Sequence, residues 1–185
     1  MRTAISKTSN EGDHVTTVKA AYTGNVLNIN ARAAIVKSAR AKCSIDELLG
    51  RAARSGGGEH FVQLFDADSI IDTTHVLAAY VNAVGTFYEH TNIAKTCAME
   101  MMLFAAMTTQ ISDAIMRVGA KDRDRLVVFA TDNAALGSIS GLMFNMRDFA
   151  PTEGHAKAAA MKFGIIAKGG RDALIMQEMA LSRLR

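Results

Sequence analysis

Residues 92–118 form a nearly unbroken apolar stretch, which constrains the fold more than any other part of the chain. Its hydrophobic residues recur every three or four positions, the spacing that aligns them along one stripe of an α-helix. Asn92 is placed to cap such a helix, and Gly119 stands where helices commonly end. We therefore predict one long helix that supplies much of the core. Its stripe consists of Ile93, Cys97, Met101, Phe104, Thr108, Ile111, Ile115 and Val118.

Three polar residues interrupt this apolar stretch, and they suggest that one edge of it binds something. A carboxylate among apolar neighbours is costly unless it is exposed or paired, so Glu100 lies at the edge of the stripe or accepts hydrogen bonds from a loop or a partner. Gln110, one residue before Ile111, poses the same alternatives. Lys95 falls in the predicted first turn, where the helix dipole disfavours a cation, and this favours an anionic partner outside the helix.

The length and composition indicate a globular protein. The chain has 185 residues, of which 49% are hydrophobic and 21% charged, a balance that excludes the disordered class. This length suits one domain, so we predict a flexible tail over residues 1–14 and a single domain over residues 15–185. The 11 methionines fill gaps in a helical core or belong to an adaptable binding surface. The net charge of +3 permits an anionic partner without requiring one.

Cysteine use and hydropathy favour a soluble, cytoplasmic protein. Cys43 and Cys97 fit no CxxC pattern, and a reduced chain is then expected. The first residues are polar and lack the apolar segment of a signal peptide. No apolar run is long enough to cross a bilayer, so no membrane partner is expected.

Predicted strands alternate with predicted helices along the rest of the chain. Residues 15–25, 61–65 and 126–131 are rich in β-branched and aromatic side chains, and the last of these runs is apolar throughout, as in a strand covered on both faces. Residues 31–43 fit a helix or a strand, and residues 132–149 give no clear prediction. We therefore predict an α/β (α+β) fold, a single layered domain with a small mixed sheet packed against several helices.

Two helix starts are marked by capping residues. Ser44 and Glu47 have the spacing of a capping box and predict a short helix that begins there. Asp72 or Thr73 is placed to cap the next helix. Residues 169–185 are expected to form the last helix.

The chain lacks the residue patterns of common catalytic and metal sites. Its five histidines show no i,i+4 pair and have no cysteine at ligand spacing, which argues against zinc. Asp66, Asp68 and Asp72 resemble a calcium loop only faintly, because the loop glycine and the terminal glutamate are missing. The glycines match neither a phosphate-binding loop nor a dinucleotide fingerprint. We predict no catalytic residue, no metal and no cofactor.

Basic residues gather in the first third of the chain. They are either a solvated face or a patch that contacts phosphates, since Lys and Arg supply most of the affinity for nucleic acid. Lys37 and Arg40 would share a face if this segment were helical. The group consists of Arg32, Lys37, Arg40, Lys42, Arg51 and Arg54; a weaker second group consists of Lys157, Lys162, Lys168 and Arg171.

An ordered set of short motifs resembles a known family. Residues 62–87 read as a strand, an acidic turn and a helix led by His75. A second stretch opens with Asn-Ile-Ala-Lys at 92–95. It continues through Glu100, a Gln-Ile-x-x-Ala-Ile motif at 110–115 and Gly119. Together they resemble the CGI-type small subunit of the KEOPS (EKC) tRNA-modification complex. The resemblance covers residues 61–131 well and the C-terminal residues loosely.

This resemblance implies a non-catalytic accessory subunit. Such subunits bind and stimulate a small atypical kinase that acts as an ATPase switch, while a separate transferase subunit makes threonylcarbamoyl-adenosine in tRNA. Archaeal members also capture tRNA by its single-stranded 3′ CCA tail. Many members carry Arg where this chain has Thr109. We expect kinase contacts from Lys95, Glu100, Gln110 and Ile111, and RNA contacts from Lys95, Arg32, Lys37 and Arg40.

Two other classes of function stay open on the sequence. The methionines and phenylalanines could line an apolar pocket of a small ligand-binding protein or enzyme, although no catalytic constellation supports this reading. The apolar helices could also join two copies of the chain in a self-associating scaffold.

Overall fold

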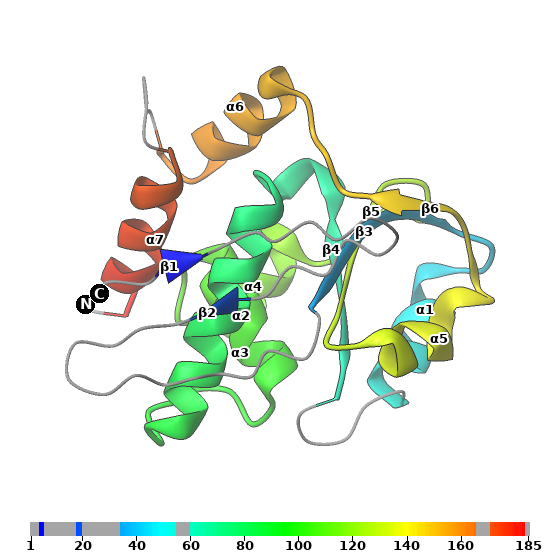
Figure 1. Cartoon of the computed structure of the whole chain (residues 1–185), viewed down its shortest axis with the longest axis horizontal. Coiled ribbons are helices and arrows are strands. Elements are labelled where there is room, and N and C mark those ends of the chain that lie inside the picture. Colours follow the sequence, from blue (N-terminus) through cyan, green and yellow to red (C-terminus); the bar gives the residue numbers. More distant parts are fainter. Residues whose placement is uncertain (1–3, 6–17, 20–33, 55–59, 166–170, 184–185) are drawn as a thin grey trace.

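The computed structural model contains seven α-helices, one short 3-10 helix (η1, Ala67–Ser69), a four-stranded sheet and a two-stranded sheet among the residues that it describes (Figure 1). The predicted mixed α/β class is confirmed. In the two-stranded sheet, β1 (Ala4–Ile5) pairs with β2 (Val18–Lys19), which falls inside the strand predicted over 15–25. The rest of that prediction, and of the predicted tail, lies outside the described residues. The described residues are 4–5, 18–19, 34–54, 60–165 and 171–183.

The four-stranded sheet has the order β4-β5-β3-β6 and is antiparallel in every pair, rather than mixed. Residues 31–43, which fitted a helix or a strand, contain strand β3 (Ile35–Ala41). The other strands are β4 (Val62–Asp66), β5 (Leu126–Ala130) and β6 (Met143–Asp148). Every residue of the central strand β5 is buried, so the predicted strand covered on both faces is confirmed.

Alternating side chains of β5 divide the core into two clusters, one on each face of the sheet. Val127 and Phe129 belong to the larger cluster with α2, α3 and the C-terminal helices, whereas Leu126 and Val128 belong to the smaller cluster. Helices α1 (Ile45–Arg54) and α5 (Asn133–Ser140) cover the smaller cluster. Figure 1 shows these two helices on the opposite side of the sheet from α2, α3 and α4.

The predicted helix caps at Ser44 and Asp72 are confirmed. The Glu47 amide donates to the Ser44 hydroxyl over 3.2 Å at the start of α1. Helix α2 (Thr73–Tyr88) begins at Asp72, whose side chain accepts from the His75 amide over 2.9 Å. A side-chain oxygen at each N-cap thus satisfies a backbone amide that has no partner inside the helix.

The prediction of one continuous helix over 92–118 is wrong. Two helices stand there, α3 (Cys97–Ala106) and α4 (Ile111–Val118). Met107 adopts the left-handed conformation with φ 53°, and the Thr108 amide donates to the Leu103 carbonyl over 3.1 Å, which ends α3. This is the Schellman type of helix end, here without the usual glycine, and it turns the chain away before α4 begins.

Both ends of the predicted long helix also need revision. Thr96, not Asn92, is the N-cap of α3, and its hydroxyl accepts from the Met99 amide over 3.3 Å. Gly119 does follow the last helical residue of α4, but with an extended backbone rather than a left-handed one. A Cβ at Gly119 would lie 2.5 Å from the Ile115 carbonyl oxygen, so this close approach requires glycine.

The last third of the chain adds helices that complete the larger cluster. Residues 132–149, which gave no clear prediction, contain α5 and β6. Helix α6 (Glu153–Lys162) places Ala156, Ala159 and Ala160 in the core, and the last helix, α7 (Arg171–Leu181), places Ile175 and Met179 there. The predicted last helix is thus confirmed in substance.

Candidate partner-binding surface

Residues 92–96 form the last part of the loop between α2 and α3, and they include Lys95, the first of the predicted contact residues. Lys95 is exposed, but it lies before the N-cap of α3 and not in the first turn of a helix. The helix-dipole argument for Lys95 is therefore wrong. Ile93 in the same loop is 48% exposed, whereas Ala94 is buried. The loop thus presents one charged and one apolar side chain to the surface.

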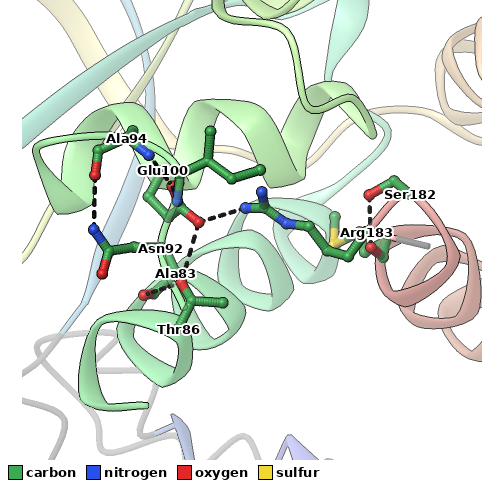
Figure 2. A network of polar contacts seen from close by, with 9 residues as sticks. Ala83, Thr86, Asn92, Ala94, Glu100, Ser182 and Arg183 are labelled. Atoms are coloured by element: carbon green, nitrogen blue, oxygen red, sulfur yellow. Dashed lines mark hydrogen bonds and ion pairs between the residues drawn. The ribbon is translucent and has the colours of Figure 1, made fainter. Parts of the chain in front are cut away.

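Glu100 lies at the centre of the molecule rather than at an exposed edge, so the predicted exposure of its side chain is wrong. Its exposed fraction is 0%. Oxygen Oε2 accepts hydrogen bonds from the backbone amides of Ile93 at 3.0 Å and of Ala94 at 2.7 Å (Figure 2). The second sequence alternative, a carboxylate that accepts donors from a loop, describes this side chain.

The other carboxylate oxygen of Glu100 connects α3 with two further helices. Oxygen Oε1 accepts from the hydroxyl of Thr86 in α2 at 3.2 Å and from nitrogen Nη2 of Arg183, just beyond α7, at 2.5 Å. The Arg183 guanidinium also lies over the ring of Phe104, 4.0 Å from its centroid. Figure 2 shows the carboxylate between the loop on one side and Arg183 on the other. Full pairing of this kind offsets the cost of burying a charge.

Helix α4 exposes an apolar face beside its buried side. Ala114 and Val118 are buried against the core, while Ile111 is 42%, Ile115 50% and Met116 63% exposed. Ile111 and Ile115 are four residues apart and share one helix face, whereas Met116 projects about 100° further round the helix, away from the core. Large aliphatic side chains that share one helix face and stay exposed mark an interaction surface more often than scattered single residues do. We call Ile111 and Ile115 the α4 apolar face, and Met116 lies beside it.

Gln110 stands at the start of this helix and faces solvent. It occupies the N-cap position of α4 and makes no side-chain capping hydrogen bond. Its side chain therefore stays available for a contact, as does that of Ile111 on the adjoining turn.

An apolar groove of about 440 Å³ adjoins the α4 apolar face. It runs along the outer edge of β4, between α1 and the first turn of α3, and Ile115 belongs both to its lining and to the α4 apolar face. Such a groove suits an apolar partner segment, and it also has the residue types that a small-ligand pocket requires. The residues that line it include Leu49, Phe61, Leu64, Cys97, Met99 and Met102.

The predicted RNA-binding residues are not brought together. Lys37 and Arg40 lie on strand β3, so the condition for their sharing a helix face is not met. Lys37 pairs with Asp148 over 2.7 Å and Arg40 with Asp124 over 3.0 Å. Lys95 adjoins the groove at the β4 edge of the sheet, which is the edge opposite β6. Arg32 lies outside the described residues.

One part of the β3–β6 side nevertheless combines cations with exposed apolar side chains. The Arg40 guanidinium lies over the Phe144 ring, 5.5 Å from its centroid. Phe144 and Met146 are each 37% exposed on the edge strand β6, where Arg147 is exposed too. Of the second basic group, Lys157 and Lys162 are exposed on α6, where Lys157 pairs with Glu153 over 3.9 Å and Lys162 donates to the Asp68 carbonyl over 2.8 Å.

The acidic residues of the faint calcium pattern have structural roles. Asp66 caps η1 by accepting from the Asp68 amide over 3.1 Å, and Asp72 caps α2. Asp68 pairs with Arg125. Across residues 4–5, 18–19, 34–54, 60–165 and 171–183, no three His, Cys, Asp or Glu side chains are grouped so that they could hold a metal ion.

The histidines likewise serve the fold. His75 is fully buried: its Nδ1 accepts from the Ile71 amide over 3.1 Å, and its Nε2 lies 2.9 Å from the Ala105 carbonyl oxygen, to which it donates in the neutral form. Burial lowers the pKa of His75 to about 4, against the opposing effect of the Ala105 hydrogen bond. His60 pairs with Asp132, the N-cap of α5, whose carboxyl pKa is lowered mainly by the hydrogen bond from the Ala135 amide.

Sequence reasoning gave no role to Arg183. Its partner Glu100 is 83 residues away, so no local spacing connects them. The exposure of Ile115 was missed as well, because its helical spacing equals that of core residues. Among the described residues no helix has the length and hydropathy of a membrane span.

An exposed apolar helix face beside an apolar groove is a feature of proteins that bind another protein. The comparison with known families agrees with this class. Residues 25–149 match the family described as kinase binding protein CGI-121, and this match spans more than half of the chain. The chain belongs to the CGI-121 family of kinase-binding proteins. It is thus a non-catalytic kinase-binding protein, and the family resemblance of its sequence is confirmed. No individually curated protein matches the chain.

Proposed function

We propose that this chain is the accessory subunit of a KEOPS complex that docks the small atypical kinase and stimulates it, in support of threonylcarbamoyl-adenosine formation in tRNA. Docking uses the α4 apolar face, Gln110 at the start of α4, and Lys95 in the loop before α3. The observation that carries this proposal is the exposure of Ile111, Ile115 and Met116 next to the groove, in a chain whose family binds kinases. This chain is connected to the transferase subunit only indirectly, through the kinase.

The physical argument is the hydrophobic surface that docking would remove from water. Each large aliphatic side chain that becomes buried contributes roughly 1.5–3 kcal/mol, and half of that surface is still exposed on Ile115. Charged groups at the rim, such as Lys95, add orientation and association rate more than affinity. Glu100 contributes indirectly, because its carboxylate fixes the backbone of the loop that carries Lys95.

Substitution of Ile115 tests the docking proposal. Ile115→Asp places a charge at the centre of the surface and is expected to weaken affinity for the purified kinase of the same organism at least about tenfold, and to reduce stimulation of its ATPase. The control is Met161→Asp on α6, an apolar side chain that is 69% exposed away from the groove. Equal affinity of both variants and the parent chain, measured by calorimetry, would contradict the proposal.

Substitution of Lys95 tests the rim of the same surface. Lys95→Glu is expected to weaken kinase binding by about threefold to tenfold at low salt, and less at high salt, because exposed charges are screened. The fold should be unaffected, since the side chain is exposed. An unchanged affinity at low salt would remove Lys95 from the contact set.

Capture of the tRNA 3′ CCA tail is the second part of the proposed function. It is favoured by the β3–β6 side, where Arg40 lies over Phe144 and Met146 and Arg147 are exposed beside them. Unpaired bases stack on aromatic side chains and guanidinium planes, while Lys and Arg contact phosphates. Of the predicted contacts, Arg40 lies there, although it also pairs with Asp124. Lys37 projects from the opposite face of β3, where it pairs with Asp148.

A gel-shift titration tests RNA capture. tRNA with an intact 3′ CCA tail is expected to bind more tightly than the same tRNA without the tail, and binding should weaken as salt increases. Phe144→Ala and Arg40→Ala should each reduce tail-dependent binding several-fold. The control Met161→Asp should leave it unchanged. Equal binding of both tRNAs, or none, would leave kinase docking as the function.

A further inference from the structure

We propose that Arg183, at the end of α7, is a positioning residue for partner binding: through Glu100 it holds the loop of residues 92–96, so that docking of the C-terminal helix and docking of the kinase favour each other. This inference rests on the proposed function of that loop. The three helices that the carboxylate connects come from distant parts of the chain (Figure 2).

The first step of the argument is that one carboxylate oxygen determines the backbone of the loop. Oε2 of Glu100 accepts both the Ile93 and the Ala94 amide, at 3.0 and 2.7 Å. Asn92 adds a third tie within the loop, from Nδ2 to the Ala94 carbonyl over 2.9 Å. Because Ile93 and Lys95 flank the buried Ala94, this geometry fixes the direction in which their exposed side chains project.

The second step is that Arg183 keeps the carboxylate in this position. Nη2 donates to Oε1 over 2.5 Å, and the Arg183 side chain is only 17% exposed. Its stacking on Phe104 at 4.0 Å adds a second contact between the end of α7 and α3. With the guanidinium removed, Glu100 would be a buried charge with a neutral hydroxyl and two amides, and it would gain by turning toward water.

The third step is that the Arg183 contact is only partly satisfied, although Ile175 and Met179 hold the preceding turns of α7 in the core. Nε and Nη1 of Arg183 are buried without a hydrogen-bond partner in the described part of the chain. A buried donor without an acceptor costs roughly 1–3 kcal/mol. Burial also lowers the pKa of the Arg183 guanidinium, an effect that the Glu100 carboxylate opposes. The Arg183–Glu100 contact thus stabilises the end of α7 less than a fully hydrogen-bonded guanidinium would.

An incompletely satisfied Arg183 contact at one end and a binding loop at the other give a thermodynamic coupling. If an attached α7 orders the loop, the kinase binds the attached state more tightly, and bound kinase must then stabilise the attachment by the same factor. Coupling energies of this kind usually correspond to changes in affinity of roughly fivefold to 150-fold.

The matched variants are Arg183→Met and Ser182→Ala, tested in the full chain. Methionine keeps an apolar side chain against Phe104 but removes the guanidinium, whereas the Ser182 hydroxyl donates to the Met179 carbonyl within the same helix end. Arg183→Met is expected to weaken kinase affinity about tenfold. It should also accelerate hydrogen exchange at the Ile93 and Ala94 amides more than at the amides of β5. Ser182→Ala should do neither.

A second pair of measurements separates positioning from a general loss of stability. The double variant Glu100→Gln with Arg183→Met removes both charges and leaves an amide oxygen for the loop, so it should recover most of the lost affinity. In the parent chain, bound kinase should slow exchange in α7, and in Arg183→Met it should not. Normal affinity of Arg183→Met, or an affinity loss that Ser182→Ala shares, would overturn the inference.

The Ile115→Asp variant distinguishes failure of this inference from failure of the proposed function. If Ile115→Asp abolishes kinase binding while Arg183→Met binds normally, the docking surface stands and the coupling is wrong. If Ile115→Asp binds normally, the docking proposal itself fails. Should Arg183→Met not fold, Arg183→Gln keeps a hydrogen-bond donor but removes the charge, and a normal affinity and exchange pattern in that variant would equally overturn the role of the charged guanidinium.

Discussion

Helices α3 and α4 follow each other in the chain and come from the same apolar stretch, yet they have opposite relations to solvent. Seven of the ten residues of α3 are buried, whereas in α4 only Ala114 and Val118 are. Helix α3 packs against α2, α4 and β4 within the larger cluster, while α4 is covered on one side only. Hydrophobic composition therefore shows that a helix has something to bury, but the covering elements decide whether it is buried within the chain.

Burial in the two helices is the reverse of the usual pattern, in which polar side chains are exposed and apolar ones are buried. The carboxylate of Glu100, in α3, is fully buried and accepts four hydrogen bonds, while the aliphatic side chains of Ile111 and Ile115, in α4, face water. A satisfied polar group stabilises a core position, and an unsatisfied apolar face indicates a partner.

The largest expected difference between the helices concerns their polar residues. Glu100→Ala should reduce the free energy of unfolding by about 3–5 kcal/mol, because it leaves the Arg183 guanidinium buried without a countercharge and the Ile93 amide without its acceptor. Gln110→Ala, at the exposed start of α4, should change it by less than about 0.5 kcal/mol. Urea denaturation measures both. Similar values for the two variants would show that the Glu100 network contributes no net stability.

The next difference concerns the apolar residues. Leu103→Ala in α3 should cost about 2–5 kcal/mol, since the side chain is fully buried and leaves a cavity. Ile111→Ala in α4 should cost less than about 1 kcal/mol, because much of its side chain is already hydrated. The same denaturation experiment compares them. A large loss for Ile111→Ala would mean that α4 is covered within the isolated chain.

Acid pH should weaken the end of α3 through His75, which holds the Ala105 carbonyl. The folded pKa of about 4 lies below the ordinary 6.5, so the unfolded chain binds more protons between these values and stability is lost as pH falls from 6.5 toward 4. Between pH 7 and pH 5 the loss should be about 2 kcal/mol. His75→Gln should remove this part of the pH dependence, and a pH profile identical to that of the parent chain would contradict it.

The smallest expected difference concerns the helix starts. Thr96 caps α3 with its hydroxyl, so Thr96→Ala should cost about 1 kcal/mol. Gln110 makes no such bond at α4, so Gln110→Asp should add up to about 1 kcal/mol by capping the helix and complementing its dipole. Thermal unfolding followed by circular dichroism measures both shifts. A stabilising effect of Thr96→Ala would contradict the capping geometry.

Local sequence signals predicted the elements that local chemistry determines. The apolar run of β5 and the capping residues Ser44 and Asp72 each act within a few positions, so their structures follow from the sequence. The break between α3 and α4 was missed because Met107 takes a left-handed conformation that usually requires Gly or Asn.

The candidate site was predicted only in part, because exposure and long-range pairing are properties of the whole fold. Lys95, Gln110 and Ile111 are exposed as expected of contact residues, whereas Glu100 is buried. No spacing argument could pair Glu100 with a residue near the C-terminus. Strand β3 was ambiguous because its alanines suit a helix as well as a tightly packed strand.

The order of strands in the sheet has a consequence for how the chain folds. Strand β3 lies between β5 and β6, and its pair Lys37 and Asp148 are 111 residues apart in sequence. Closing such long loops costs chain entropy before any strand contact is made. The logarithm of the folding rate therefore falls as the contact order rises. During synthesis β3 emerges early and has no strand to pair with until most of the chain has left the ribosome. We therefore expect α2, α3 and α4, which are close in sequence, to collapse first and to present the surface on which the sheet is later completed.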